Sequence, residues 1–244
     1  MFRDIGQVRL LRILFTNWNI KKGHLIKNNQ FDFDILQSYH YLFGFLSNVF
    51  LESPDSDFIQ NIISQKLFDD WLIEPHHPSM VKGTRIMQDF FKCWNPERID
   101  DLKLDYTRLF IGLESTLAPP YESVYLSQDH IMFDKQTLDV RLFYEKYNLR
   151  VPRKNVEPDD HIGYELHFIA LLCHRIIAEF QEGRNEGADQ TIVDLSNFLD
   201  RHLLLWLDAF VDRIVKHARV DYFRGIALLT QSSVECLSNT VKSL

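Results

Sequence analysis

The chain has 244 residues, 45% of them hydrophobic, and is therefore long enough to bury a substantial apolar core. Its formal net charge of −7 argues against a nucleic-acid-binding protein, because such proteins normally present a basic face. The three cysteines are scattered along the chain, which predicts reduced thiols and a cytoplasmic location. No apolar run is long enough to span a bilayer, so no stable membrane insertion is expected.

The first residues of the chain have a character of their own. Residues 8–15, with the sequence VRLLRILF, mix basic and apolar side chains. A secretory signal peptide needs a longer uncharged apolar run and a cleavage site of small residues, and neither is present. We expect a short helix or tail that packs on the body of the protein, with a disordered segment and a membrane-surface helix as the alternatives.

Apolar residues recur at steps of three or four from residue 35 onward, which predicts successive amphipathic helices. The first four are residues 35–50, ended by Ser53-Pro54; 58–71, begun by Asp55 or Asp57; 79–94, capped by Ser79; and 99–110, ended by Gly112. Trp71 and Trp94 lie on apolar helix faces and are predicted core residues. Residues 113–136 are predicted to be irregular.

The second half of the chain continues the helical pattern. It predicts a short helix of residues 137–147, a polar connector at 148–157, a helix of 158–180, one long helix of 192–214 and a last helix of 222–241. No stretch shows the alternation of a strand. The expected fold is therefore all-α, a single helical domain of about ten helices, with the connector as a candidate hinge between two halves.

Residues 157–168, with the sequence EPDDHIGYELHF, contain four acidic residues and two histidines but no lysine or arginine. Pro158 suits the first position of a helix, where its missing N–H would have no partner in any case. Asp159 and Asp160 are then expected in the first turn, where the helix dipole favours carboxylates. These acids are either helix caps or part of a binding surface.

Two catalytic interpretations of this segment have less support than a cap or a binding surface. Asp160 and His161 resemble an acid–base pair, but neighbours in sequence do not face each other on a helix. His161 and Glu165 have the i, i+4 spacing of metal ligands, but two ligands alone make a weak site. We therefore predict no catalytic residue and no metal site, and keep a helical metal-dependent hydrolase using His161 and Glu165 as the alternative.

Residues 119–125, with the sequence PPYESVY, combine a stiff proline turn with aromatic side chains. Tyr121 and Tyr125, at an i, i+4 step, either cover a core helix or form the wall of a peptide-binding groove. Glu122 offers an acceptor for an arginine of a bound peptide. Both interpretations remain open at the level of residue chemistry.

Together these segments resemble the TorD/DmsD family of chaperones, which mature molybdenum oxidoreductases. The stretch from Glu157 to Leu166 is similar to one family signature, and residues 106–112 followed by 118–125 are similar to another. The resemblance covers about residues 34–244, the predicted chaperone domain, and leaves 1–33 as an N-terminal extension. One departure is Leu113, because the family often has proline at this position.

The resemblance implies an all-helical cytoplasmic chaperone that is not an enzyme. No cofactor is predicted, and binding of a nucleotide or of molybdopterin is left open. Its expected partners are the twin-arginine leader peptide and the catalytic subunit of a molybdenum oxidoreductase, with no nucleic acid. A helical scaffold protein without leader specificity is a further alternative. The oligomeric state is expected to be a monomer, or a dimer that exchanges halves about the connector.

The predicted leader-binding residues are Tyr121, Glu122, Ser123, Glu157, Pro158, Asp159, Asp160 and His161. The resemblance implies the role of Asp160 and His161 in leader recognition. An acidic rim of Glu157, Asp159 and Asp160 is expected to pair with the guanidinium groups of the leader. On this hypothesis, Asp160→Ala weakens leader binding more than it weakens folding.

Overall fold

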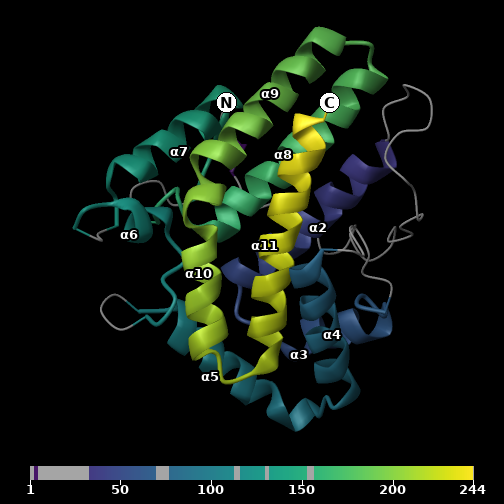
Figure 1. The fold of residues 1–244 in the computed structure, drawn as a ribbon, viewed down its shortest axis with the longest axis vertical. Coiled ribbons are helices and arrows are strands. Elements are labelled where there is room, and N and C mark those ends of the chain that lie inside the picture. Colours follow the sequence, from purple (N-terminus) through teal and green to yellow (C-terminus); the bar gives the residue numbers. More distant parts are fainter. Residues whose placement is uncertain are drawn as a thin grey trace.

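Four helices form the two most extensive helix pairs of the structure. α2 (Phe33–Leu51) packs along α8 (Ile162–Gln181), and α4 (Pro78–Lys92) packs along α11 (Asp221–Lys242). The computed structural model describes residues 3–4, 33–69, 77–112, 116–129, 132–152 and 157–243. In Figure 1, α11 runs through the middle of the molecule. Each pair joins an early helix to a late one, so distant parts of the sequence share one core.

A cluster of phenylalanines shows this shared core directly. Phe50 of α2 and Phe110 of α5 (Ile99–Phe110) meet Phe210 of α10 (Leu203–His217) and Phe223 of α11. Their ring centroids lie between 5.6 and 6.1 Å apart. Aromatic rings at such distances bury large apolar areas and add a specific edge-on contact. Residues on both sides of the predicted connector therefore pack into a single hydrophobic core.

Two glycines allow the close approach of α4 and α11. A Cβ at Gly225 would lie 2.5 Å from Sδ of Met87 and 3.3 Å from the carbonyl oxygen of Gly83. A Cβ at Gly83 would lie 3.1 Å from the carbonyl oxygen of Gly225. Because such distances are shorter than normal van der Waals contacts, larger side chains would push the helices apart.

The predicted helices 35–50 and 99–110 are confirmed by α2 and α5, and a single 3-10 turn, η1 (Pro96–Arg98), precedes α5. The prediction of a helix over 58–71 is too long, because α3 (Ser56–Ser64) ends seven residues earlier. Its predicted cap is confirmed, since Oδ1 of Asp55 accepts a 2.7 Å hydrogen bond from the N–H of Phe58. The predicted core residue Trp71 lies outside the described residues, whereas Trp94 packs, partly buried, against the core.

The start of α4 corrects the predicted cap. α4 begins at Pro78, with His77 at the N-cap, so the assignment of Ser79 as the cap is wrong. The physical reason is that proline has no N–H to satisfy and its fixed φ already matches a helix. Pro78 therefore indicates the start of this helix better than Ser79, the serine that precedes the apolar run.

The single long helix predicted over 192–214 is wrong, because the chain forms two helices there. α9 (Asn185–Arg201) ends at His202, where the backbone takes φ −125° and ψ −95°, and α10 follows at once. The His202 ring turns inward, and its Nδ1 lies 3.0 Å from Oε2 of Glu122. The break between α9 and α10 thus coincides with a buried contact that joins residues far apart in the sequence.

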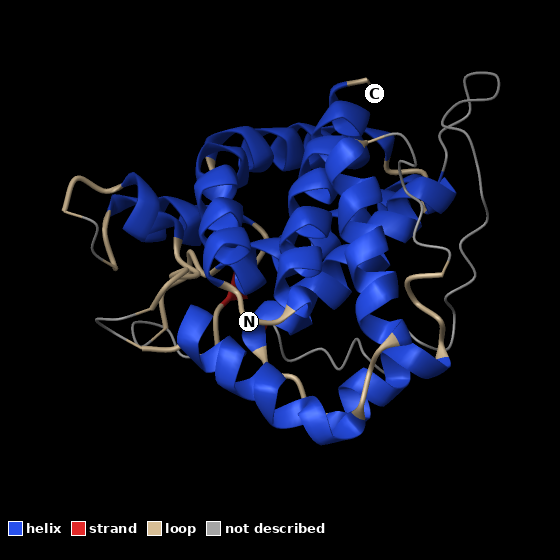
Figure 2. Ribbon diagram, turned by 60° about the horizontal axis from the view of Figure 1, so that its bottom comes forward, coloured by secondary structure: helices blue, strands red, loops and turns tan. Residues whose placement is uncertain are grey.

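The segment predicted as irregular contains a short helix, α6 (Glu122–Leu126). α7 (Lys135–Lys146) follows, begun by Asp134, whose Oδ1 accepts from the N–H of Lys135. Within the described residues the only strands are β1 (Arg3–Asp4) and β2 (Leu149–Arg150), which pair in parallel. The all-α prediction is confirmed, and Figure 2 shows the predominance of helices. Among these helices, none has both the length and the apolar character of a membrane span.

Candidate functional site

The two segments singled out by the sequence lie against each other in the structure. Tyr121 and His161 form an isolated antiparallel β-bridge immediately before α6 and α8 respectively. We call this contact the motif junction and define it as residues 118–126 and 157–165. Two helices therefore start from one place, although their sequences are far apart.

Backbone hydrogen bonds close the motif junction on both sides of the bridge. The N–H of Glu122 donates to the carbonyl of Asp160 at 3.1 Å, and the N–H of Ile162 donates to the carbonyl of Pro120 at 2.8 Å. Each bond satisfies a group at a helix start that has no partner within its own helix. The junction is thus a structural part of both helices.

Asp160 lies completely inside the junction, with no exposed surface. Its Oδ2 accepts a 2.7 Å bond from the N–H of Ser123, and its Oδ1 accepts a 2.7 Å bond from Oγ1 of Thr137 on α7. The Tyr121 side chain makes no cap bond to α6, so Asp160 caps this helix from another part of the chain. A single carboxylate therefore holds three elements together.

Asp159 is also buried, and it is bound to α7. Its Oδ2 accepts from Nη2 of Arg141 at 2.7 Å and from Nε at 3.1 Å. Its backbone carbonyl accepts from the hydroxyl of Tyr144 at 3.1 Å. Two hydrogen bonds from one guanidinium offset much of the cost of burying this charge.

The start predicted for the helix of residues 158–180 is wrong. α8 begins at Ile162, so Pro158 does not take its first position and Asp159 and Asp160 do not lie in its first turn. His161 is the N-cap instead, and its Nδ1 accepts a 3.0 Å bond from the N–H of Gly163. The two acids satisfy donors on α6 and α7, which local sequence patterns do not reveal.

His161 is half-buried, and burial lowers its pKa to about 3. The ring is therefore neutral near pH 7, and because Nδ1 accepts a bond, the proton resides on Nε2. Tyr121 lies edge-on to this ring at 5.2 Å and Tyr164 at 5.7 Å. Burial also raises the pKa of Tyr121, so its hydroxyl stays protonated. The result is a neutral aromatic surface with hydrogen-bond donors.

The structure divides the predicted leader-binding residues into two groups. Tyr121, Glu157 and His161 are half-buried and reach the surface. The remaining five are buried: Glu122, Ser123, Pro158, Asp159 and Asp160. Of the three carboxylates expected in an acidic rim, only that of Glu157 is partly exposed, and it accepts a hydrogen bond from the hydroxyl of Tyr164. The role of these residues in leader binding remains a prediction.

The sequence interpretation missed several partners of this site, namely Thr137, Arg141, His202 and Trp206. Thr137 binds Asp160 and Arg141 binds Asp159. His202 contacts Glu122, which lies 80 positions earlier in the sequence. No spacing rule links such residues, and only the fold brings them together. The alternative metal pair of His161 and Glu165 gains no further ligand, since the described chain contains no cluster of three groups suited to a metal.

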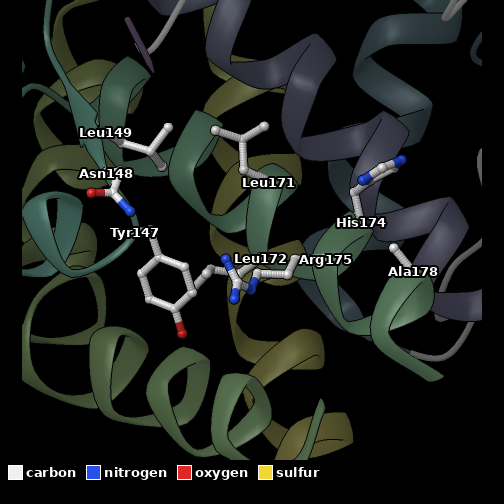
Figure 3. A pocket seen from close by; sticks show the side chains of 8 residues that line it. All are labelled: Tyr147, Asn148, Leu149, Leu171, Leu172, His174, Arg175 and Ala178. Atoms are coloured by element: carbon white, nitrogen blue, oxygen red, sulfur yellow. The ribbon is translucent and has the colours of Figure 1, made fainter. Parts of the chain in front are cut away.

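A surface pocket lies away from the motif junction. It has a volume of about 560 Å³ and is lined by Tyr147, Asn148, Leu149, Leu171, Leu172, His174, Arg175 and Ala178. Figure 3 shows Arg175 beside the ring of Tyr147, and its Cζ lies 5.0 Å from the ring centroid. The same guanidinium donates from Nε to Glu179 at 2.8 Å. None of the predicted leader-binding residues lines this pocket.

Comparison with known proteins gives a consistent set of relatives. A family model described as nitrate reductase delta subunit matches residues 78–212. A Tat proofreading chaperone DmsD of Salmonella typhi is 25% identical over 186 residues, covering 76% of this chain and 82% of the relative. A DmsD protein of Haemophilus influenzae is 29% identical over 190 residues, which cover 78% of this chain and 85% of the relative.

Two further similarities were found, one to a sequence and one to a solved structure. A chaperone protein TorD of Aliivibrio salmonicida is 31% identical over 144 residues, which cover 59% of this chain and 64% of the relative. A crystal structure of a redox enzyme maturation protein from Archaeoglobus fulgidus is 19% identical, with a TM-score of 0.47. The similarity covers 86% of this chain and 99% of that one.

Proposed function

This chain belongs to the nitrate reductase delta subunit family, and from that premise we propose that it is a cytoplasmic chaperone for the maturation of a molybdenum oxidoreductase. Its task is to bind the twin-arginine leader peptide of the client and to hold the client until cofactor insertion is complete. The relatives named DmsD and TorD confirm the resemblance to the TorD/DmsD family. They are named as chaperones, so the activity is binding and not catalysis.

The observation that carries the leader-binding proposal is the meeting of both family segments at the motif junction. The bridge between Tyr121 and His161 places one residue of each segment side by side at a half-buried surface. A surface that is partly apolar and partly polar suits a peptide with an arginine pair followed by an apolar stretch.

Each exposed residue has a specific part in this proposal. The carboxylate of Glu157 is partly exposed and accepts charge-assisted hydrogen bonds from a leader guanidinium. The Nε2–H of His161 donates to a leader carbonyl. The ring of Tyr121 contacts the apolar part of the leader. The buried residues at the junction, among them Asp159 and Asp160, act by positioning this surface.

Titration calorimetry with a synthetic twin-arginine leader tests the proposal. Glu157→Gln removes the charge, and His161→Asn keeps an acceptor for the cap of α8 but removes the ring and its Nε2–H. We expect each variant to bind the leader about tenfold more weakly, which corresponds to one charge-assisted or well-placed hydrogen bond. The urea unfolding midpoint of Glu157→Gln is expected to stay at the wild-type value.

The matched control is Glu186→Gln, which changes an exposed glutamate at the start of α9. A leader with its arginines replaced by lysine is the second control, because lysine keeps the charge but lacks the planar fork of donors. Wild-type affinity in both site variants would show that the junction is not the leader site. Absence of leader binding by the wild type, together with failure to co-purify a client catalytic subunit, would overturn the function itself.

A further inference from the structure

Three carboxyl groups lie together in the interior of the motif junction. Glu122, Asp160 and Glu165 expose 1%, 0% and 0% of their surface. Asp160 has two donors, Ser123 N–H and the Thr137 hydroxyl, which stabilise its charge. Burial of a carboxylate is costly without such donors. The other two groups are therefore the ones whose charge needs an explanation.

Glu122 and Glu165 have very different surroundings. Nδ1 of His202 lies 3.1 and 3.0 Å from the two oxygens of Glu122. No group in the described chain donates a hydrogen bond of normal geometry to either oxygen of Glu165. Nε1 of Trp206 is also without a partner of normal geometry in the described chain, and it interacts with Glu165. Glu165 thus has a carboxylate neighbour, Glu122, and no cation of its own.

The groups that face Glu165 come from every element around the junction. α6 contributes Glu122, the segment before α8 contributes Asp160, α7 contributes the Tyr144 hydroxyl, and α10 contributes the indole of Trp206. Among these and their direct partners, His202 is the one group that can carry a positive charge, and it already faces Glu122. Three carboxyl groups therefore share at most one cation.

We propose that Glu165 is a neutral carboxylic acid in the folded protein near pH 7, that it shares its proton with Glu122, and that loss of this proton opens the motif junction. The O–H of Glu165 donates to the carboxylate of Glu122, which also accepts from His202. The proton then joins α8 to α6 beneath the bridge of Tyr121 and His161. Without it, two adjacent carboxylates repel each other across the junction.

The electrostatics support this arrangement. Burial raises the pKa of Glu165 well above its usual range, and the charges of Glu122 and Asp160 raise it further. Burial also raises the pKa of Glu122, against the opposing effect of His202. The folded chain therefore binds this proton more tightly than the unfolded chain does. Stability must then fall as the pH rises from the ordinary range of glutamate towards the folded pKa.

Urea unfolding of the full chain between about pH 7 and 8 isolates this effect. Histidines with lowered pKa values act at lower pH, and the buried Cys173 thiol, whose pKa is raised by burial, acts at higher pH. We expect the folding constant of the wild type to fall close to tenfold for each pH unit, the value for one linked proton. Glu165→Gln removes this dependence, and the exposed control Glu186→Gln retains it. Equal pH dependence in Glu165→Gln and the wild type would overturn the proposal.

Infrared spectroscopy of the wild type provides a test that does not require the variant to fold. With 13C-labelled glutamate, we expect the absorption of a protonated glutamate carboxyl at pH 7. Its absence would contradict the proposal. Hydrogen exchange of the Glu122 and Ile162 amides, which close the junction, should accelerate beyond the intrinsic rate as this absorption disappears at higher pH. Unchanged protection would show that the proton does not hold the junction closed.

The inference concerns the junction itself and does not depend on leader binding. If the calorimetric experiment shows no leader binding, the infrared and exchange measurements still decide the state of Glu165. If Glu165 proves to be ionised at pH 7, the leader-binding proposal is unaffected.

Discussion

The carboxylate of Asp160 accepts a 2.7 Å hydrogen bond from the backbone N–H of Ser123, and so begins a helix that lies 37 residues earlier in the chain. The sequence suggests that this acid either caps its own helix or faces a ligand. In the structure it is fully buried and caps α6 instead of its own helix, and its part in leader recognition remains a prediction. We therefore expect Asp160 to act on the proposed binding surface by holding it in place.

The first prediction concerns the stability contributed by Asp160. Asp160→Ala leaves the Ser123 N–H and the Thr137 hydroxyl without their buried acceptor, and we expect the free energy of unfolding to fall by about 3 kcal/mol. Thr137→Val removes one of the two bonds and should cost about 1–2 kcal/mol. Urea denaturation measures both, and the exposed Thr107→Val variant, which loses only an intrahelical bond, is the control.

The double variant tests whether the two residues act together. Because Thr137 donates to Asp160, the loss in the double variant should be smaller than the sum of the single losses. Strictly additive losses would show that the 2.7 Å bond makes no energetic contribution. A normal unfolding midpoint for Asp160→Ala combined with weak leader binding would instead support direct recognition of the leader by Asp160.

The second prediction concerns the ion pair between Arg141 and Asp159. Arg141→Met leaves a buried carboxylate without its cation, and such losses typically cost about 3–5 kcal/mol. Arg141→Met combined with Asp159→Asn removes the unpaired charge and should recover part of this loss. Thermal and urea unfolding measure the effect. An Arg141→Met single variant as stable as the wild type would show that water or another group replaces the guanidinium.

The third prediction concerns the contact between α8 and the end of α2. A Cβ at Gly163 would lie 2.5 Å from Cγ and 2.8 Å from Cδ2 of Leu51. We expect Gly163→Ala to destabilise the protein by about 1–3 kcal/mol through overpacking. Leu51→Ala in the same chain removes the clash, so the double variant should be more stable than the sum of the two single effects indicates.

Gly187→Ala is the matched glycine control, because a Cβ there lies 3.4 Å from the nearest atoms of Glu179, within ordinary contact. Gly187 is in α9, where alanine is the better helix former, so this change should be neutral or slightly stabilising. Equal destabilisation by both changes would show that the helix start, and not the contact with Leu51, determines the effect.

The fourth prediction concerns stability at acid pH. Burial lowers the pKa of His161 to about 3 and that of His167 to about 4. The unfolded chain binds these protons more tightly than the folded chain does, so the stability they maintain is present above about pH 6.5 and is lost as the pH falls towards those values. Each histidine should lower the free energy of unfolding by about 1.4 kcal/mol per pH unit in this window.

Ring resonances in NMR spectra test the premise directly. We expect neither His161 nor His167 to titrate between pH 5 and 8 in the folded protein. His167→Phe, which replaces a buried ring whose Nε2 has no partner in the described chain, should reduce the acid dependence of unfolding by one proton. A midpoint near pH 6.5 for either ring would contradict the prediction.

The sequence alone determined the helical character of the chain and its family. The apolar period of three to four residues is set by neighbours on one helix, so α2, α5 and α11 lie close to their predicted ranges. The family signatures are local as well, and they indicated both segments of the motif junction before their contact was known.

Only the tertiary structure decided where the polar groups of these segments point. Asp160 meets Ser123 across 37 residues and Glu122 meets His202 across 80, so no periodicity within a helix records either contact. The first contact lies at the start of α6, inside a segment predicted as irregular, and the second lies at His202, where the helix predicted over 192–214 is interrupted. A buried charge must find a donor wherever the fold supplies one, and its position therefore depends on the packing of the whole chain.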